Sequence, residues 1–326
     1  AGIYDRYGNA AGLMGLEVTN SEIAYIGVKN SGSAYGLSLE RSEVYIAGNS
    51  IHDCGRRGVS LVLYETDPSV IRDVVIEGNH FYNGYHTTGV DVQSNGARTG
   101  GHIIENLTIR GNLFGGDPSY IIGEGDNTSS NHIFMNQDTG SQLREIYIYN
   151  NIFTYAPGSS IKTSGGENVF IHNNTFYGFN HSYDNYQAHI FGGNHTENTV
   201  IQNNICYNDA PDNRYACIEI GNGRHAHYTV DNNLYYTSTY AHARLLWVDR
   251  GTSFFFDDAW SSYTSSTGFD AHSPSPADPL FVDAPLDFRI QGTSSAVGAG
   301  VDVSWVTTDF NGSPRTSPPD IGAIQH

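Results

Sequence analysis

Apolar and polar residues alternate in short segments that recur along the chain. Seven segments share one pattern, in which alternating apolar residues are followed by asparagine and then by another apolar pair. They are residues 44–51, 74–81, 107–114, 146–153, 169–176, 199–206 and 228–235. An α-helix would need apolar residues three and four positions apart, which these segments lack. Each segment therefore predicts a β-strand that turns at its asparagine.

The recurring asparagines predict how these strands are arranged. They are Asn49, Asn79, Asn112, Asn151, Asn174, Asn204 and Asn233, between 23 and 39 residues apart. A single short strand cannot bury its apolar face alone, whereas coils that stack on one another form parallel sheets around one core. Stacked amides can hydrogen-bond from coil to coil, so we assign these asparagines a structural role and no catalytic one. We expect a parallel β-solenoid over residues 1–250, with an irregular capping segment over 251–326 packed on it.

The strand that follows each asparagine turn has a middle residue between two inward-facing apolar residues. Because side chains alternate between the faces of a strand, this middle residue is expected to face solvent. Stacking places successive middle residues about 4.8 Å apart. The expected outward row is Ser60, Asp91, Glu124, Lys162, His189, Glu219 and Trp247. A row of mixed acidic, basic and aromatic side chains favours a glycan-binding groove, and an ordinary charged surface is the alternative.

Charge narrows the possible partners. The formal net charge is −18, and only 16 of the 326 residues are lysine or arginine. Such a surface repels nucleic-acid phosphates and anionic lipid head groups, so neither is expected as a partner. No run of 18 apolar residues predicts a transmembrane segment. An acidic polysaccharide would need a local basic residue or a metal ion.

Three cysteines cannot all pair within one chain, and Cys54, Cys206 and Cys217 match no zinc-binding spacing. Buried free thiols are the favoured interpretation. A disulfide between Cys206 and Cys217 is the alternative.

The repeats resemble right-handed parallel β-helix proteins of the pectate-lyase-like superfamily. The C-terminal sequence, with its Asp278–Phe281, Asp287–Ile290 and Asp320–Ala323 motifs, is similar to the tail of many secreted bacterial β-helix proteins. The resemblance implies a right-handed β-helix of roughly ten rungs, a secreted or cell-surface location and a polysaccharide or oligosaccharide partner. The superfamily holds lyases, glycoside hydrolases, epimerases and non-catalytic proteins. No catalytic signature of the pectate lyases or polygalacturonases is recognisable here.

We expect a polysaccharide-active enzyme, with β-elimination preferred over hydrolysis. In elimination, a base removes the proton next to a uronate carboxylate while a cation stabilises the charge that develops. Lys162 and His189 are the candidate bases. The candidate substrate-binding residues are Trp247, Arg214, Arg244 and Tyr186.

Acidic residues support two further hypotheses. Asp91, Glu124 and Asp126 could hold Ca²⁺, which needs several oxygen ligands. In hydrolysis, Asp91 and Glu124 on adjacent rungs would suit a retaining mechanism, whereas Glu219 lies several rungs from both. The alternative to an enzyme is a non-catalytic extracellular glycan-binding or filament protein, which would self-assemble through the ends of the solenoid.

Overall fold

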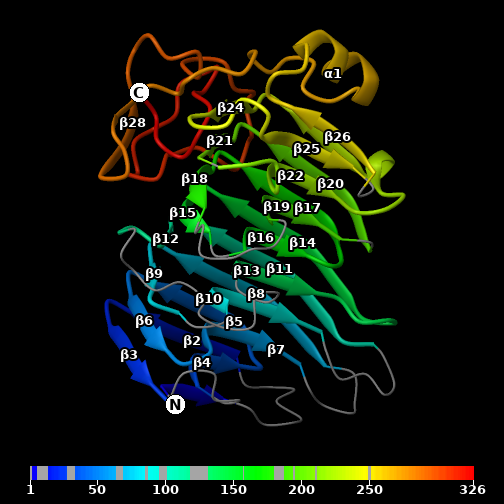
Figure 1. Cartoon of the computed structure of the whole chain (residues 1–326). Coiled ribbons are helices and arrows are strands. Elements are labelled where there is room, and N and C mark those ends of the chain that lie inside the picture. Colours follow the sequence, from blue (N-terminus) through cyan, green and yellow to red (C-terminus); the bar gives the residue numbers. More distant parts are fainter. Residues whose placement is uncertain are drawn as a thin grey trace.

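The computed structural model describes most of the chain. The described residues are 2–5, 14–27, 34–63, 69–84, 87–94, 101–117, 131–156, 158–179, 187–193, 195–209, 211–248 and 251–326. They form an all-β protein, a right-handed parallel β-helix in which three long sheets run along the stack (Figure 1). We call the three sheets A, B and C. Along the chain, each coil contributes one strand to sheet B, then one to sheet C and then one to sheet A. The predicted fold class is confirmed.

Sheet A has ten strands, of which the last is antiparallel to its neighbour. In spatial order they are β1 (Ile3–Asp5), β4 (Tyr35–Leu39), β7 (Arg57–Val62), β10 (Thr87–Gln93), β13 (Asn131–Asn136), β16 (Ser159–Thr163), β19 (Gln187–Gly192), β22 (Tyr215–Ile220), β25 (Arg244–Val248) and β26 (Thr252–Phe255).

Sheets B and C have eight parallel strands each. Sheet B comprises β2 (Met14–Thr19), β5 (Ser42–Ala47), β8 (Val70–Glu77), β11 (Ile103–Arg110), β14 (Gln142–Tyr149), β17 (Gly166–His172), β20 (Thr196–Gln202) and β23 (Tyr228–Asp231). Sheet C comprises β3 (Glu22–Ile26), β6 (Ser50–Cys54), β9 (His80–Tyr82), β12 (Leu113–Phe114), β15 (Ile152–Ala156), β18 (Thr175–Phe179), β21 (Ile205–Asn208) and β24 (Leu234–Thr237).

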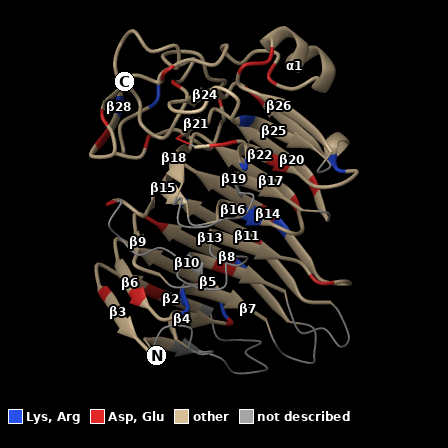
Figure 2. Ribbon diagram, in the orientation of Figure 1, with Lys and Arg blue, Asp and Glu red and all other residues tan. Residues whose placement is uncertain are grey.

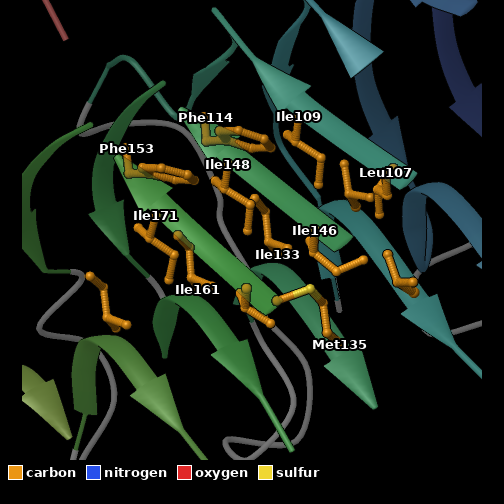
Figure 3. Close-up of a cluster of buried hydrophobic side chains, with 14 of the residues drawn as sticks. Leu107, Ile109, Phe114, Ile133, Met135, Ile146, Ile148, Phe153, Ile161 and Ile171 are labelled. Carbon is orange, nitrogen blue, oxygen red and sulfur yellow. The ribbon is translucent and has the colours of Figure 1, made fainter. Parts of the chain in front are cut away.

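The core lies inside the coils, where equivalent apolar residues stack in register. Figure 3 shows ten labelled core side chains from all three sheets, among them Ile109, Phe114 and Ile133, meeting in this interior. The rings of Phe114 and Phe153 are parallel, with their centroids 4.7 Å apart. Burying apolar area stabilises the fold by about 25 cal/mol per Å². A coil gains this stabilisation only because the neighbouring coils cover its apolar side chains.

The asparagine ladder forms as predicted, at the corner between sheets B and C. The Asn151 Nδ2 donates to the Oδ1 of Asn174 at 3.0 Å and to the carbonyl of Ile109 at 2.8 Å, and this pattern repeats along the ladder from Asn49 to Asn204. At the C-terminal end of the ladder, Asn233 donates to the Oδ1 of Asp270 at 3.3 Å. The ladder satisfies buried backbone groups at every corner, which is the structural role we expected.

The left-handed backbone at each corner belongs to the residue before the ladder asparagine. In the N-terminal coils this residue is glycine, as at Gly78 and Gly111, with φ of 62° and 61°. In the later coils it is asparagine, at Asn150, Asn173, Asn203 and Asn232, with φ between 51° and 59°. Both residue types tolerate this conformation.

The cysteines correct one prediction. Cys206 and Cys217 form a disulfide between β21 and β22, with their Cα atoms 6.0 Å apart, and Cys54 is a buried free thiol. Because Cys206 on sheet C and Cys217 on sheet A both face the interior of one coil, their side chains meet. The preference for free thiols is therefore wrong for this pair.

The C-terminal segment packs on the solenoid after β26. It contains α1 (Trp260–Thr267), β27 (Phe281–Asp283) and β28 (Asp287–Ile290), while the short 3-10 helix η1 (His225–His227) precedes β23. In Figure 1 the part of the segment that follows α1, orange to red, lies beside the later strands of sheet C. Ile205 and Leu234 pack there against Ile290 and Ile321. The division of the chain at residue 250 remains a prediction.

Candidate functional site

Sheet A carries one continuous row of side chains in register on its outer side. From the N-terminal end, the row is Ser38, Ser60, Asp91, Phe134, Lys162, Phe191, Glu219 and Trp247. We call this the sheet A row. The structure brings together four of the predicted site residues, Asp91, Lys162, Glu219 and Trp247, and adds two aromatic residues that the sequence alignment missed.

His189 does not belong to the row. Ile190 pairs with Ile161 and Phe191 with Lys162, so Phe191 takes the place expected for His189. Within β19, His189 and Ile190 are consecutive buried residues. The His189 ring stacks on Phe179 with centroids 4.0 Å apart, and its Nδ1 lies 3.1 Å from the Ser160 hydroxyl. Burial lowers the pKa of His189 to about 3, so it is not the predicted external base.

Three predicted site residues, Glu124, Asp126 and Tyr186, lie outside the described residues. The row position expected for Glu124 belongs to Phe134, because the apolar pair that pairs with the neighbouring strands is Ile133 and Met135. The 39-residue interval between Asn112 and Asn151 contains two apolar segments. The second one, with Ile133 and Met135, supplies the strand that pairs in sheet A.

Asp91 is buried in a network of donors rather than open to a ligand. Its Oδ2 lies 2.8 Å from Arg57 Nη1, and Gln93 Nε2 donates to both of its oxygens at 2.7 and 3.0 Å. Burial raises the pKa of Asp91 to about 6, while Arg57 and Gln93 act in the opposite direction. Because its oxygens already accept from an arginine and an amide, Asp91 does not fit as a Ca²⁺ ligand. Among the described residues, no group of three His, Cys, Asp or Glu side chains could hold a metal ion.

Lys162 lies between two aromatic rings of the row. Its Nζ is 5.3 Å from the centre of the Phe191 ring and 6.0 Å from that of Phe134. Ring faces at these distances attract a cation. An ammonium held in this way can bind an anion. The chain has only one other lysine, Lys29.

Glu219 lies in the row beside a cleft. The cleft has a volume of about 270 Å³ and is lined by Ser164, Phe191, Gly193, His195, Glu219, Gly221 and Asn222. Glu219 itself is only 1% exposed, whereas His195 is exposed at the rim. The cleft places a carboxylate, an imidazole and amide or hydroxyl groups around one small space. Such a set can hydrogen-bond to sugar hydroxyls or exchange a proton with a bound ligand.

The C-terminal end of the row is aromatic and cationic. The Arg244 guanidinium lies 4.5 Å from the centre of the Trp247 ring, and its Nε donates to the Ser253 hydroxyl at 3.1 Å. Arg244 Nη1 also donates to the carbonyl of Asn213. Arg214 forms a bidentate pair with Asp212 at 2.7 to 3.1 Å.

The acidic residues of the row are too far apart to act as a pair. Asp91 and Glu219 are separated by four register steps, which corresponds to about 19 Å along the stack. Retaining and inverting hydrolases need carboxyl groups within about 5–10 Å. Within the described part of the row, paired-carboxylate hydrolysis therefore lacks its second group.

Comparison with known proteins adds information about the fold. A family model described as a protein of unknown function (DUF1565) matches residues 6–139, which is the N-terminal part of the stack. This family is associated with right-handed β-helix proteins, in agreement with the parallel sheets. No curated protein matches the chain. The resemblance to the pectate-lyase-like superfamily and to secreted bacterial tails stays a prediction. In the described part of the chain, no helix has the length and apolar character to span a membrane.

Proposed function

We propose that the sheet A row binds a polysaccharide that contains acidic sugars. The observation that carries this proposal is the alternation of aromatic and charged residues from Phe134 to Trp247. Phe134, Phe191 and Trp247 occupy every second rung, about 9.6 Å apart. A polymer that lies along the stack would meet an aromatic ring at regular intervals, and aromatic rings pack well against sugar rings.

The acidic character of the ligand follows from the cations on this face. The protein as a whole is strongly acidic, yet Lys162 and Arg244 both lie on the sheet A row or directly beside it. Figure 2 shows how sparse the basic segments are and that β16 and β25, the strands of these two residues, each carry one. A uronate carboxylate would gain a charge-assisted hydrogen bond at either position.

β-Elimination at the cleft is the second candidate function. Glu219 is an acidic residue of the row that lines a cleft, and Lys162 is two rungs away. In this reaction Glu219 would take the proton next to the uronate carboxylate, and Lys162 would neutralise the charge that develops there. The electron pair left behind would form a C=C bond as the glycosidic C–O bond breaks, and the leaving oxygen would take a proton from water. Because His189 does not belong to the row, Glu219 replaces it as the candidate base.

The proposed location is outside the cytoplasm. Buried disulfides such as Cys206–Cys217 persist in oxidising compartments and are rare in the cytosol of most organisms. A polysaccharide ligand suits the same location.

One experiment separates these functions. Purified protein is mixed with polygalacturonate, alginate and hyaluronan, and with the neutral polymers xylan and glucomannan as controls. Binding is measured by affinity electrophoresis, unsaturated products by ultraviolet absorbance and new reducing ends by a colour assay. Retardation by uronate polymers without products supports binding alone, and unsaturated products establish elimination. If no uronate polymer binds and none is cleaved, the proposal is wrong.

A further inference from the structure

The C-terminal segment lies along the corner between sheets B and C. It forms hydrogen bonds with asparagines that come directly before a ladder asparagine in the sequence. Asn150 donates to the carbonyl of Thr308 at 2.6 Å, and Arg315 donates to Asn150 at 2.7 Å. Asn203 exchanges hydrogen bonds with the backbone of Val301, at 2.8 and 2.9 Å. The corner residues change from glycine to asparagine at Asn150, which is where these contacts with the tail begin.

A cleft lies where the corners covered by the C-terminal segment, which begin at Asn150, meet the corners formed by Gly78 and Gly111. It has a volume of about 200 Å³ and lies between the outer side of sheet B and the tail. Its lining includes Glu77, Arg110, Tyr149, Asn150, Trp305 and Asp309. None of these residues belongs to the sheet A row. The space is smaller than the roughly 300–1,000 Å³ of pockets for drug-sized ligands, so it suits a single ring-sized polar unit.

Arg110 organises the polar side of this cleft. Its Nη2 lies 2.8 Å from the Oε2 of Glu77, and its Nη1 donates to the Tyr149 hydroxyl at 3.0 Å. The Nε of Arg110 is buried and has no hydrogen-bond partner among the described residues. An adjacent guanidinium, carboxylate and phenol supply donors and acceptors on neighbouring positions, which matches the vicinal hydroxyl groups of a sugar. Because Glu77 already neutralises Arg110, the cleft favours a neutral ligand over an anion.

Trp305 forms the aromatic side. Its ring meets those of Tyr147, Phe170 and His172 at centroid distances of 5.5 to 5.8 Å, with planes 68° to 80° apart. The indole thus rests on three rings of sheet B and still leaves 43% of Trp305 exposed. A fixed, partly exposed indole beside hydroxyl-binding groups is the arrangement that binds one face of a pyranose ring.

We propose that this cleft is a second carbohydrate site, which takes one neutral sugar unit against Trp305 and holds its hydroxyls through Arg110, Glu77 and Tyr149. The site lies on a different sheet from the acidic-polymer site, and neither needs the other to exist. A glycan that contains both neutral and acidic units would be held at two places on one molecule, which raises its apparent affinity without new contacts.

The test is a titration of full-length protein with neutral tetrasaccharides built from glucose, xylose or mannose, by calorimetry and saturation-transfer NMR up to about 10 mM. We expect one of these series to bind, and Arg110→Gln and Trp305→Phe each to weaken that binding by about tenfold. Arg144→Gln is the matched control. Arg144 pairs with Glu105 at 2.6 Å on the same sheet with similar exposure, 38% against 41%, but does not line the cleft.

Circular dichroism and thermal melting establish that each variant is folded. The inference is overturned if no tetrasaccharide binds, if Arg110→Gln binds as wild type does, or if Arg144→Gln weakens binding equally. The sheet A variant Trp247→Ala separates the two proposals. Loss of neutral-sugar binding in Trp247→Ala but not in Arg110→Gln would place all carbohydrate on sheet A. Loss in Arg110→Gln alone supports the second site whatever happens with acidic polymers.

Discussion

Lys162 and Phe191 occupy paired positions on neighbouring strands of sheet A, and the Lys162 ammonium lies 5.3 Å from the centre of the Phe191 ring. The next register partner of Phe191 is Glu219. One ring therefore separates a cation from a carboxylate along the outer side of the sheet. This order supplies a site for an anion next to a carboxylate that lines a cleft.

Replacing Lys162 is the most direct test of acidic-polymer binding. Lys162→Met keeps most of the apolar stem between the two phenyl rings and removes the charge. We expect uronate-polymer binding to weaken by roughly 10- to 150-fold, because a charge-assisted hydrogen bond is worth roughly 1.5–3 kcal/mol, while the melting temperature changes little. Affinity electrophoresis measures the binding. Arg72→Met, on sheet B with 54% of its side chain exposed, is the control, and equal effects in both variants would exclude a specific role for Lys162.

Glu219 tests the reaction separately from the binding. If elimination occurs, Glu219→Gln should reduce the rate of formation of unsaturated products by at least about 100-fold, the usual contribution of a general base. Polymer binding should change much less, because the amide keeps the shape and hydrogen-bonding capacity of the side chain. Initial rates from ultraviolet absorbance give the answer. Product formation at an unchanged rate would exclude Glu219 as the base.

The asparagine ladder should dominate the stability of the corners. Asn151 Nδ2 donates to two carbonyl oxygens and to Asn174, and Asn151 Oδ1 accepts from Asn112. Asn151→Ala leaves several buried groups unsatisfied, so we expect it to lower the free energy of unfolding by about 3 kcal/mol. Urea unfolding measures the loss. Asn311→Ala, at an exposed turn, should change stability by less than about 0.5 kcal/mol.

The sequence predicts the fold well because the same local pattern recurs in each coil. Alternating apolar residues decide which side chains face inward, and the asparagines mark each corner. For Asp91, Lys162, Glu219 and Trp247, the two flanking residues are buried on the inner side, so their common row could be aligned without a structure. The roles proposed for these residues are not decided by that alignment.

The errors arise where the pattern is not locally unique. His189 and Ile190 are consecutive buried residues on one strand, and a strict alternation of inward and outward side chains cannot represent that. Phe134 lies after an insertion that contains a competing apolar segment. Arg57 and Gln93, which hold Asp91, and the Cys206–Cys217 pair depend on which side chains meet in three dimensions. Sequence spacing alone leaves such contacts open.

The disulfide should stabilise the C-terminal coils. It closes a short loop with a sequence separation of 11, for which chain entropy predicts about 3 kcal/mol of stabilisation. We expect the Cys206→Ala, Cys217→Ala double variant to lose about that much free energy of unfolding in urea. Cys54→Ala, which removes a buried thiol without a cross-link, is the control. Reduction of the wild type with a thiol reagent should reproduce the effect of the double variant, and an unchanged midpoint would contradict this role.

Buried histidines should make the fold sensitive to acid. Burial lowers the pKa of His132 and His189 to about 3 and that of His172 to about 4. The unfolded chain therefore binds protons below about pH 6.5 that the folded chain does not, and stability falls as the pH drops from 6.5 towards 4. Asp91, whose pKa is raised to about 6, acts in the opposite direction over the same range because its folded form takes up a proton first. Burial also raises the pKa of Asp270 and lowers that of His80. The four histidines outnumber the two carboxyls, so urea midpoints should fall between pH 7 and 4.5. His132→Leu should reduce the total loss of unfolding free energy between pH 6.5 and 4.5 by about 2–3 kcal/mol, since each pKa unit corresponds to 1.36 kcal/mol. His272→Leu, at an exposed histidine, is the control, and a pH slope that His132→Leu leaves intact would show that His132 does not cause it.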